Sequence, residues 1–245
     1  MKTVALIQAR MGSTRLPGKV TLPLAGDTVL AHVIRRVKAA ECVDAVVVAA
    51  PDLECDDIVA YFARETGTAV HRGPHEDVLT RLHEAAVTVD ADTVVRVSAD
   101  SPLVLPNYID HAISLIESEG VEYVTDALER TFPMGVACEA FTRQSFDRVS
   151  SAATSSEQRE HVTTYYRENL EKFDHHNVDS SEDPFAEALV GRTDLRFTLD
   201  RAADYALIRR IYEGVDFDEV VDVVDAVRYV DDNGLAEINN HVQQR

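Results

Sequence analysis

The sequence is poor in residues that crosslink secreted domains, and it holds no long apolar run. Its 245 residues include no tryptophan and only three cysteines, Cys42, Cys55 and Cys138. That odd number, without a CxxC pair, predicts neither a disulfide framework nor a zinc site. No uninterrupted apolar stretch reaches the roughly 18 residues that cross a bilayer, and Met1 leads into a strand-like run without a signal-peptide layout. We therefore expect a soluble, cytoplasmic protein that does not bind membranes.

Positive charge is also scarce, and it is unevenly distributed. The chain carries 24 Lys and Arg against 43 Asp and Glu, a formal net charge of −19. Residues 1–50 nevertheless hold seven basic and three acidic residues, a local charge of +4. An acidic surface disfavours nucleic-acid binding, because that affinity depends on pairing cations with phosphates. The composition is typical of proteins from salt-accumulating cells, and a basic partner is the alternative.

Alternating β-branched runs and amphipathic segments predict an α/β fold, with a mostly parallel sheet covered by helices on both faces. The predicted strands are Thr3–Gln8, Ala45–Ala49, Thr68–His71, Thr93–Val97, residues 121–126 and RFTLD at 196–200. The predicted helices are one that Asp27 caps, then Val78–Val89, Asn107–Glu119, Phe141–Val149, Glu157–Leu170, Ala202–Glu213, Asp218–Asp231 and Gly234–Val242. We expect one domain, 1–245, in which residues 130–170 form a small inserted arm outside the sheet, as a substrate flap or dimer contact.

Three cations stand in one loop, RMGSTRLPGK, directly after the first predicted strand. Loops at the carboxyl edge of a parallel sheet form the usual ligand crevice of open α/β folds. Backbone N–H groups and the side chains of Arg10, Arg15 and Lys19 could together surround a polyphosphate there. The loop is neither GxGxxG nor Walker A, since Val20 stands where Ser or Thr would bind magnesium. A basic surface turn is the alternative.

Two aspartates follow predicted strands at the same edge. Asp100 ends VVRVSAD, and Asp200 ends RFTLD. Such carboxylates could coordinate Mg²⁺, which favours one or two carboxylates together with phosphate oxygens. Two structural alternatives remain open: a turn-forming Asp100 and a helix-capping Asp200.

Two further segments carry residues suited to anionic ligands. Arg159 and His161, in EQREHVT, could grip an anionic substrate from one helical turn, or they could lie on a solvated helix face. Arg72, in RGPHEDVLTR, follows a predicted strand and could line a pocket at the carboxyl edge, although the segment also suits an ordinary acidic helix start.

Several motifs together resemble a known family. IQARMGSTRLPGKV, RGPHEDVLTRLHEAA, VVRVSADSPLVLP, PMGVACEAF, REHVT and LRFTLD, in order from residue 4 to about residue 210, resemble the spore-coat-polysaccharide type of cytidylyltransferase. These proteins are related to the 3-deoxy-manno-octulosonate and acylneuraminate cytidylyltransferases. The resemblance implies a Rossmann-like nucleotidyltransferase that uses Mg²⁺ to transfer CMP from CTP to an acidic sugar, releasing pyrophosphate, for surface glycan synthesis.

The resemblance also implies residue roles and a homodimer. Arg10, Lys19 and Asp100 would be catalytic, and Asp100 and Asp200 would bind the metal. The implied nucleotide-binding residues are Ala9, Arg10, Gly12, Ser13, Arg15, Lys19, Arg72 and Ser98. The implied sugar-binding residues are Pro133, Gly135, Glu139, Arg159 and His161.

Two positions depart from the related motifs. Ser98-Ala99 stands where the octulosonate enzymes carry Gln-Gly before the metal aspartate. Gly135-Val136-Ala137 stands where the spore-coat type usually has Gly-Leu-Asp. These departures concern the base and the sugar rather than the reaction.

Three other functions compete with cytidylyl transfer. A sugar-1-phosphate nucleotidyltransferase using another NTP shares the arginine-rich first loop. A non-catalytic nucleotide-binding module would need no pair of metal carboxylates. A glycosyltransferase is disfavoured, because no DxD tripeptide stands at the predicted strand ends.

Overall fold

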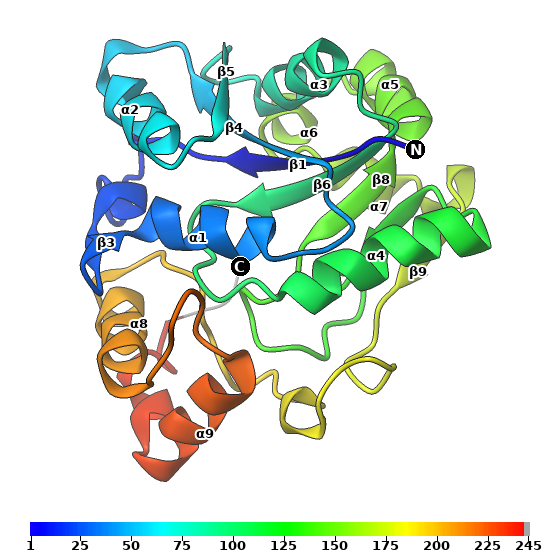
Figure 1. Cartoon of the computed structure of the whole chain (residues 1–245). Coiled ribbons are helices and arrows are strands. Elements are labelled where there is room, and N and C mark those ends of the chain that lie inside the picture. The colour runs from blue at the N-terminus through cyan, green and yellow to red at the C-terminus, as the bar shows by residue number, and fades with distance from the viewer. Residues whose placement is uncertain (243–245) are drawn as a thin grey trace.

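A central sheet organises the protein. The computed structural model describes residues 1–242, in which seven strands lie in the order β5-β4-β1-β6-β8-β7-β9 (Figure 1). All of them run in one direction except β8, which is antiparallel to β6 and β7. The strands are β1 (Thr3–Gln8), β4 (Ala45–Pro51), β5 (Ala69–Gly73), β6 (Thr93–Ser98), β7 (Tyr123–Thr125), β8 (Glu139–Thr142) and β9 (His175–Asn177), with a separate ribbon of β2 (Pro23–Leu24) and β3 (Asp27–Thr28). The mostly parallel sheet is as predicted.

Both faces of the sheet are buried, which explains the continuous apolar run of the first strand. Successive side chains of a strand point to opposite faces. In β1, Ala5 and Ile7 pack into one hydrophobic cluster, whereas Val4 and Leu6 pack into the other. A strand covered on both sides has no polar face, as is typical of parallel sheets.

Helices cover the two faces (Figure 1). Helices α1 (Val29–Lys38), α2 (Asp57–Glu65) and α4 (Pro106–Glu119) contribute to the cluster that contains Ala5, and α3 (Val78–Thr88), α5 (Arg143–Ala152) and α7 (Thr164–Glu168) contribute to the one that contains Val4. The remaining helices are α6 (Ser156–Glu160), α8 (Ala202–Gly214) and α9 (Val223–Asp232). None of the helices within residues 1–242 is long and apolar enough to cross a membrane.

Two helix starts differ from the prediction because a neighbouring residue supplies the cap. Helix α1 is capped by Thr28, whose Oγ1 accepts a 3.2 Å bond from the Ala31 N–H, and not by Asp27. Helix α9 starts at Val223, later than predicted, because the Asp222 side chain accepts from the first-turn N–H groups. After α9, the predicted helix Gly234–Val242 is only a 3₁₀ turn at Leu235–Ile238.

Part of the middle segment is built into the sheet. Glu139–Thr142, predicted in part as helix, pairs as β8 with both β6 and β7, so α5 begins only at Arg143. Because β8 runs against β6, its first residue Glu139 lies opposite Arg96 near the carboxyl end of β6. Residues 130–170 therefore include one strand of the sheet, and the role of this segment as a flap or dimer contact stays a prediction.

The predicted helix Glu157–Leu170 is broken near its middle. It consists of α6 and α7, joined by a turn in which Val162 has φ 33° and is fully buried. A β-branched residue adopts positive φ only where the surrounding packing imposes it. The turn leaves His161 exposed beside the carboxyl edge of the sheet.

RFTLD is an irregular extended segment rather than a sheet strand. Its Arg196 forms only an isolated parallel bridge with Met134. The neighbouring Gly135 has φ 94°, and a Cβ there would lie 2.7 Å from the Thr198 nitrogen. Glycine is therefore required at 135 for this close backbone approach.

Candidate active site

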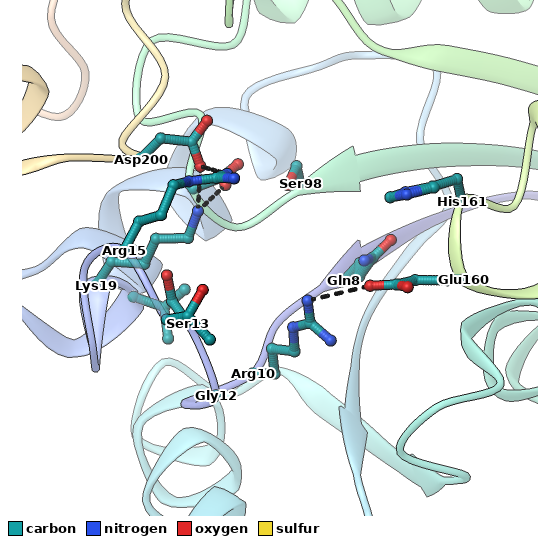
Figure 2. A pocket seen from close by; sticks show the side chains of 13 residues that line it. Gln8, Arg10, Gly12, Ser13, Arg15, Lys19, Ser98, Glu160, His161 and Asp200 are labelled. Carbon is teal, nitrogen blue, oxygen red and sulfur yellow. Dashed lines mark hydrogen bonds and ion pairs between the residues drawn. The ribbon is translucent and has the colours of Figure 1, made fainter. Parts of the chain in front are cut away.

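A cavity of about 510 Å³ opens at the carboxyl edge of β1 and β6 (Figure 2). We refer to it as the loop cavity, because the cationic loop 10–19 supplies six of its thirteen lining residues. It is lined by Gln8, Arg10, Gly12, Ser13, Thr14, Arg15, Lys19, Val20, Ser98, Asp100, Glu160, His161 and Asp200. Two predicted groups of residues, the loop cations and the strand-end aspartates, thus share one cavity.

The centre of the loop cavity is a lysine between two carboxylates. Lys19 Nζ donates to Asp100 Oδ2 and, at 2.9 Å, to Asp200 Oδ1. Burial alone would lower the pKa of Lys19, but the two carboxylates outweigh burial and raise it. Gly18, with φ 67°, makes the turn into the 3₁₀ helix Lys19–Thr21 that positions this side chain.

Asp200 is held by three cations. Its Oδ1 accepts from Lys19 and, at 2.8 Å, from Arg15 Nη2 (Figure 2). Its Oδ2 accepts from Arg196 Nη2, also at 2.8 Å. Burial would raise the pKa of Asp200, but the Arg15 hydrogen bond and the Lys19 charge hold it well below its usual range. The carboxylate is therefore ionised at neutral pH.

A buried network behind Asp200 was not predicted from the sequence. Asp204, which is fully buried, accepts a 3.0 Å bond from Arg196 Nε and a 2.8 Å bond from Asn239. It also accepts from the N–H groups of Asp200 and Arg201, so Asp204 caps α8. The Asp200 side chain is consequently not the helix cap and faces the cavity; the i, i+4 spacing of Arg196 and Asp200 was the available sequence signal.

The remaining loop residues lie around the cavity mouth. Arg10 forms an ion pair with Glu160 on α6 (Figure 2), in which Arg10 Nη2 lies 3.7 Å from Glu160 Oε1. Ser13 lines the cavity, and its Oγ accepts from the Leu16 N–H at 3.3 Å. Ala9 is buried behind the loop, where its N–H donates to the Ala49 carbonyl.

Two predicted arginines do not reach the loop cavity. Arg72 donates to the Pro51 and Leu53 carbonyls and to Asp57, so it closes the turn after β4. Arg159 donates to Asp77 Oδ2 at 2.8 Å and to Thr80, so it fixes α6 against the start of α3. Local acceptors thus occupy both guanidinium groups.

A second cavity of about 220 Å³ adjoins the first, and the two share Ser98 and His161. We refer to it as the β8 cavity, because Glu139, the first residue of β8, lines it together with the residues just before that strand. It is lined by Arg96, Ser98, Ser101, Asp126, Ala127, Ala137, Cys138, Glu139, His161, Thr163 and Arg167. Of these, Arg96, Asp126 and Arg167 were not predicted from the sequence.

Glu139 is fully engaged within the β8 cavity. Its carboxylate accepts from Arg96 Nη1 at 2.5 Å, from the Tyr123 hydroxyl at 2.7 Å and from Thr163 Oγ1 at 3.0 Å. Burial would raise the pKa of Glu139, but Arg96 and the two hydroxyl donors outweigh it and lower the pKa. Arg96 and Glu139 therefore line the cavity as an ion pair whose two charges compensate each other.

Two predicted sugar-facing residues lie away from both linings. Pro133 is buried, and Gly135 packs against Thr198. Their segment is fixed by backbone bonds between Met134 and both Leu195 and Phe197. Pro133 and Gly135 therefore pack behind the residues that line the cavities and do not line the cavities themselves.

The donor set of the loop cavity fits a magnesium ion that arrives with phosphates. Within residues 1–242, no group of three or more His, Cys, Asp or Glu side chains could hold a metal by itself. Asp100 and Asp200 supply two carboxylates, and Mg²⁺ commonly uses one or two carboxylates together with substrate phosphates. The residues present therefore suit a shared metal and not an all-protein site.

Comparison with known proteins identifies the family. The family model described as Cytidylyltransferase matches residues 4–223. The chain belongs to the cytidylyltransferase family. It is therefore a nucleotidyltransferase enzyme, and the predictions of family, fold class and enzyme class are confirmed.

Individual relatives agree with this assignment. This cytidylyltransferase is 32% identical over 213 residues to the spore coat polysaccharide biosynthesis protein SpsF of Bacillus subtilis, covering 85% of each chain. It matches the structure of a cytidylyltransferase from Leptospira borgpetersenii with a TM-score of 0.88 and 30% identity, over 100% of this chain and 99% of that one. It also shares the fold of CMP:2-keto-3-deoxy-manno-octonic acid synthetase complexed with CTP, with a TM-score of 0.65 and 20% identity, over 87% and 99% of the chains.

Proposed function

We propose that this chain uses Mg²⁺ to transfer CMP from CTP to a hydroxyl of an acidic sugar, releasing pyrophosphate, in the cytoplasmic synthesis of a surface glycan. The observation that carries the proposal is the joined pair of cavities, one with loop cations facing two carboxylates and one with an arginine at its rim. The names of SpsF and of the octonic acid synthetase support the polysaccharide context and the pair of substrates.

The loop cavity would bind the nucleotide. Arg10, Arg15 and Lys19, with Ser13 and the loop N–H groups, would surround the triphosphate. Asp100 and Asp200 would hold Mg²⁺, which when bound would neutralise phosphate charge. Since Lys19 Nζ lies between these carboxylates, it would exchange at least one of them for a phosphate oxygen as the nucleotide binds.

The transfer itself needs positioning and charge stabilisation. The sugar hydroxyl attacks the α-phosphorus in line, an O–P bond forms, and the bond to the pyrophosphate oxygen breaks. The loop cations would stabilise the charge that develops on the leaving pyrophosphate. The chemistry requires no covalent enzyme intermediate.

The β8 cavity would bind the acceptor beside the α-phosphate. His161 and Ser98, which line both cavities, stand where the nucleotide and the sugar would meet. Pro133, Gly135 and Arg159 would shape this region indirectly, through the backbone contact with Thr198 and the anchoring of α6.

The proposal also covers the organisation of the protein. We propose that the chain is a single domain over 1–245, that it forms a homodimer, and that residues 130–170 take part in the dimer contact or in a substrate flap.

The proposal is tested by pyrophosphate release from CTP, UTP, ATP and GTP at high KCl with Mg²⁺, across acidic sugars and sugar phosphates. We expect release with CTP and at least one acidic sugar. Release only with a sugar-1-phosphate or another NTP would favour the sibling reaction. Nucleotide binding without turnover for any pair would favour a non-catalytic module.

A further inference from the structure

The β8 cavity contains a carboxyl group, that of Asp126, which accepts no side-chain hydrogen bond from any residue between 1 and 242. Asp126 directly follows β7, and because β7 is parallel to β6 the residue lies at the same sheet edge as Asp100. In the part of the chain that the structure describes, no other residue donates a hydrogen bond to this carboxyl group, and its own backbone N–H is its donor. Arg96, the nearby basic wall residue, is committed to Glu139.

The surroundings of Asp126 make its charge costly. Burial raises the pKa of Asp126 to about 6; Arg130 opposes this only in part, and the Glu139 charge adds to it. A desolvated carboxylate is stabilised most by a cation that also donates hydrogen bonds, and a neutral hydroxyl compensates its charge less. Asp126 is therefore suited to a positively charged group of a ligand.

The same cavity offers a complementary cation at its rim. Arg167, on α7, lines the cavity and is exposed, and within the described part of the chain it donates only a long 3.5 Å bond, from Nη2 to Thr164. Ala137 lines the cavity at the position where the related motif carries an acid, so that position supplies no charge here. Besides the Arg96–Glu139 pair, the cavity thus presents the guanidinium of Arg167, from α7, and the carboxyl group of Asp126, from the end of β7, to a single small ligand.

Resting on the function proposed above, we propose that the acceptor is an amino-substituted sugar acid, whose carboxylate binds Arg167 and whose ammonium group binds Asp126. Asp126 is then the residue that selects an amino sugar acid over its hydroxyl counterpart. An ammonium–carboxylate bond in a partly desolvated pocket supplies this selectivity, because the hydroxyl analogue leaves Asp126 without a counter-charge.

The test compares matched acceptors in one assay. The probes are 3-deoxy-manno-octulosonate and its analogues in which one hydroxyl at a time is replaced by a primary amine, each with CTP and Mg²⁺. We expect the wild-type chain to use at least one amino analogue with a kcat/KM at least about tenfold higher than the parent. Asp126→Asn should remove this preference through the acceptor KM, leaving the KM for CTP unchanged, and the exposed Asp216→Asn should behave as wild type.

Calorimetric binding of the same acceptors separates this proposal from the proposed function. Selective binding of an amino analogue that Asp126→Asn abolishes, without turnover, would support the specificity role and contradict the enzymatic one. Equal or better binding and use of the hydroxyl parent by the wild type would overturn the role of Asp126. Retention of the amino preference by Asp126→Asn, or no binding of any sugar acid, would overturn it as well.

Discussion

In the loop cavity Lys19 is bonded to both Asp100 and Asp200, whereas in the β8 cavity the Asp126 carboxyl has no donor beyond its own backbone among the described residues. In the loop cavity, a triphosphate can bind Lys19 only if Lys19 gives up at least one of these two carboxylates. In the β8 cavity, the Asp126 carboxyl group can instead bind a ligand directly, without first giving up a side-chain partner. On the function proposed above, the loop cavity would carry out the reaction and the β8 cavity would select the acceptor.

The largest expected effect is at the centre of the loop cavity. Asp100→Asn removes one of the two carboxylates, and we expect turnover to fall on the order of 10³-fold through lost stabilisation of phosphate charge. Among residues 1–242 the Asp100 side chain bonds only Lys19, so the fold should persist, as circular dichroism would show. Asp232→Asn, an exposed control, should retain full pyrophosphate release. Near-normal activity of Asp100→Asn would show that Asp100 is not part of the active site.

The network behind Asp200 should contribute to stability as well as position. Arg196→Met leaves Asp204 buried without its charged partner, and we expect a loss of about 3 kcal/mol in the free energy of unfolding. Asn239 and two backbone N–H groups still donate to Asp204. We therefore expect a loss of stability at the lower end of the range for breaking a buried ion pair. Urea unfolding would measure it.

The matched control for this network is a pair on the surface. In the part of the chain that the structure describes, Arg209→Met breaks only the exposed pair with Glu213, so its cost should be close to zero. Equal effects of the two substitutions would contradict the importance of burial.

Lys19→Ala should affect the loop cavity in two opposite directions. Loss of the ammonium should lower turnover by about 10²-fold through weaker triphosphate stabilisation. The same change should strengthen Mn²⁺ binding in the absence of nucleotide, because Lys19 no longer occupies the point between the carboxylates. Electron paramagnetic resonance of free Mn²⁺ measures this, with Lys38→Ala as the control. Unchanged turnover and apparent NTP affinity would refute the assigned role.

The smallest effect should be a gain of stability in the β8 cavity. Because the pKa of Asp126 is about 6 in the folded chain and 3.8 ordinarily, folding disfavours its ionised form, and stability falls as pH rises from about 4 through about 6. Asp126→Asn removes this cost, so it should stabilise the chain by about 1–2 kcal/mol at pH 8 and by less at pH 5. Thermal melts at fixed KCl would measure both. No difference between the two pH values would contradict the burial of this charge.

The sequence predicted the loop cavity better than the β8 cavity, for a physical reason. Arg15, Lys19 and Asp100 follow strands of a parallel sheet, and this topology alone brings strand ends to one edge. The β8 cavity depends on an antiparallel strand inserted beside β6 and on the positive φ of Val162, which breaks a helical pattern. Tertiary packing decides both features, so local propensity does not reveal them.

Individual side chains show the same limit. Arg72 and Arg159 have the right type and place in the sequence for anion binding, yet carbonyls and Asp77 hold them elsewhere. Asp126, which stood in a predicted strand, acquires its significance only from the residues that surround it in space. The burial and the bonding partners of each side chain distinguish Arg72 and Arg159 from Asp126, and sequence patterns do not specify either property.

The central claim is that the two cavities together join CMP to an acidic sugar. The most direct measurement is ³¹P NMR of the chain incubated with CTP, Mg²⁺ and a sugar acid. The account predicts equal amounts of pyrophosphate and of one new phosphodiester signal from a CMP-sugar. A diphosphate-linked sugar formed only from a sugar-1-phosphate, or CTP unchanged with every sugar acid, would contradict it.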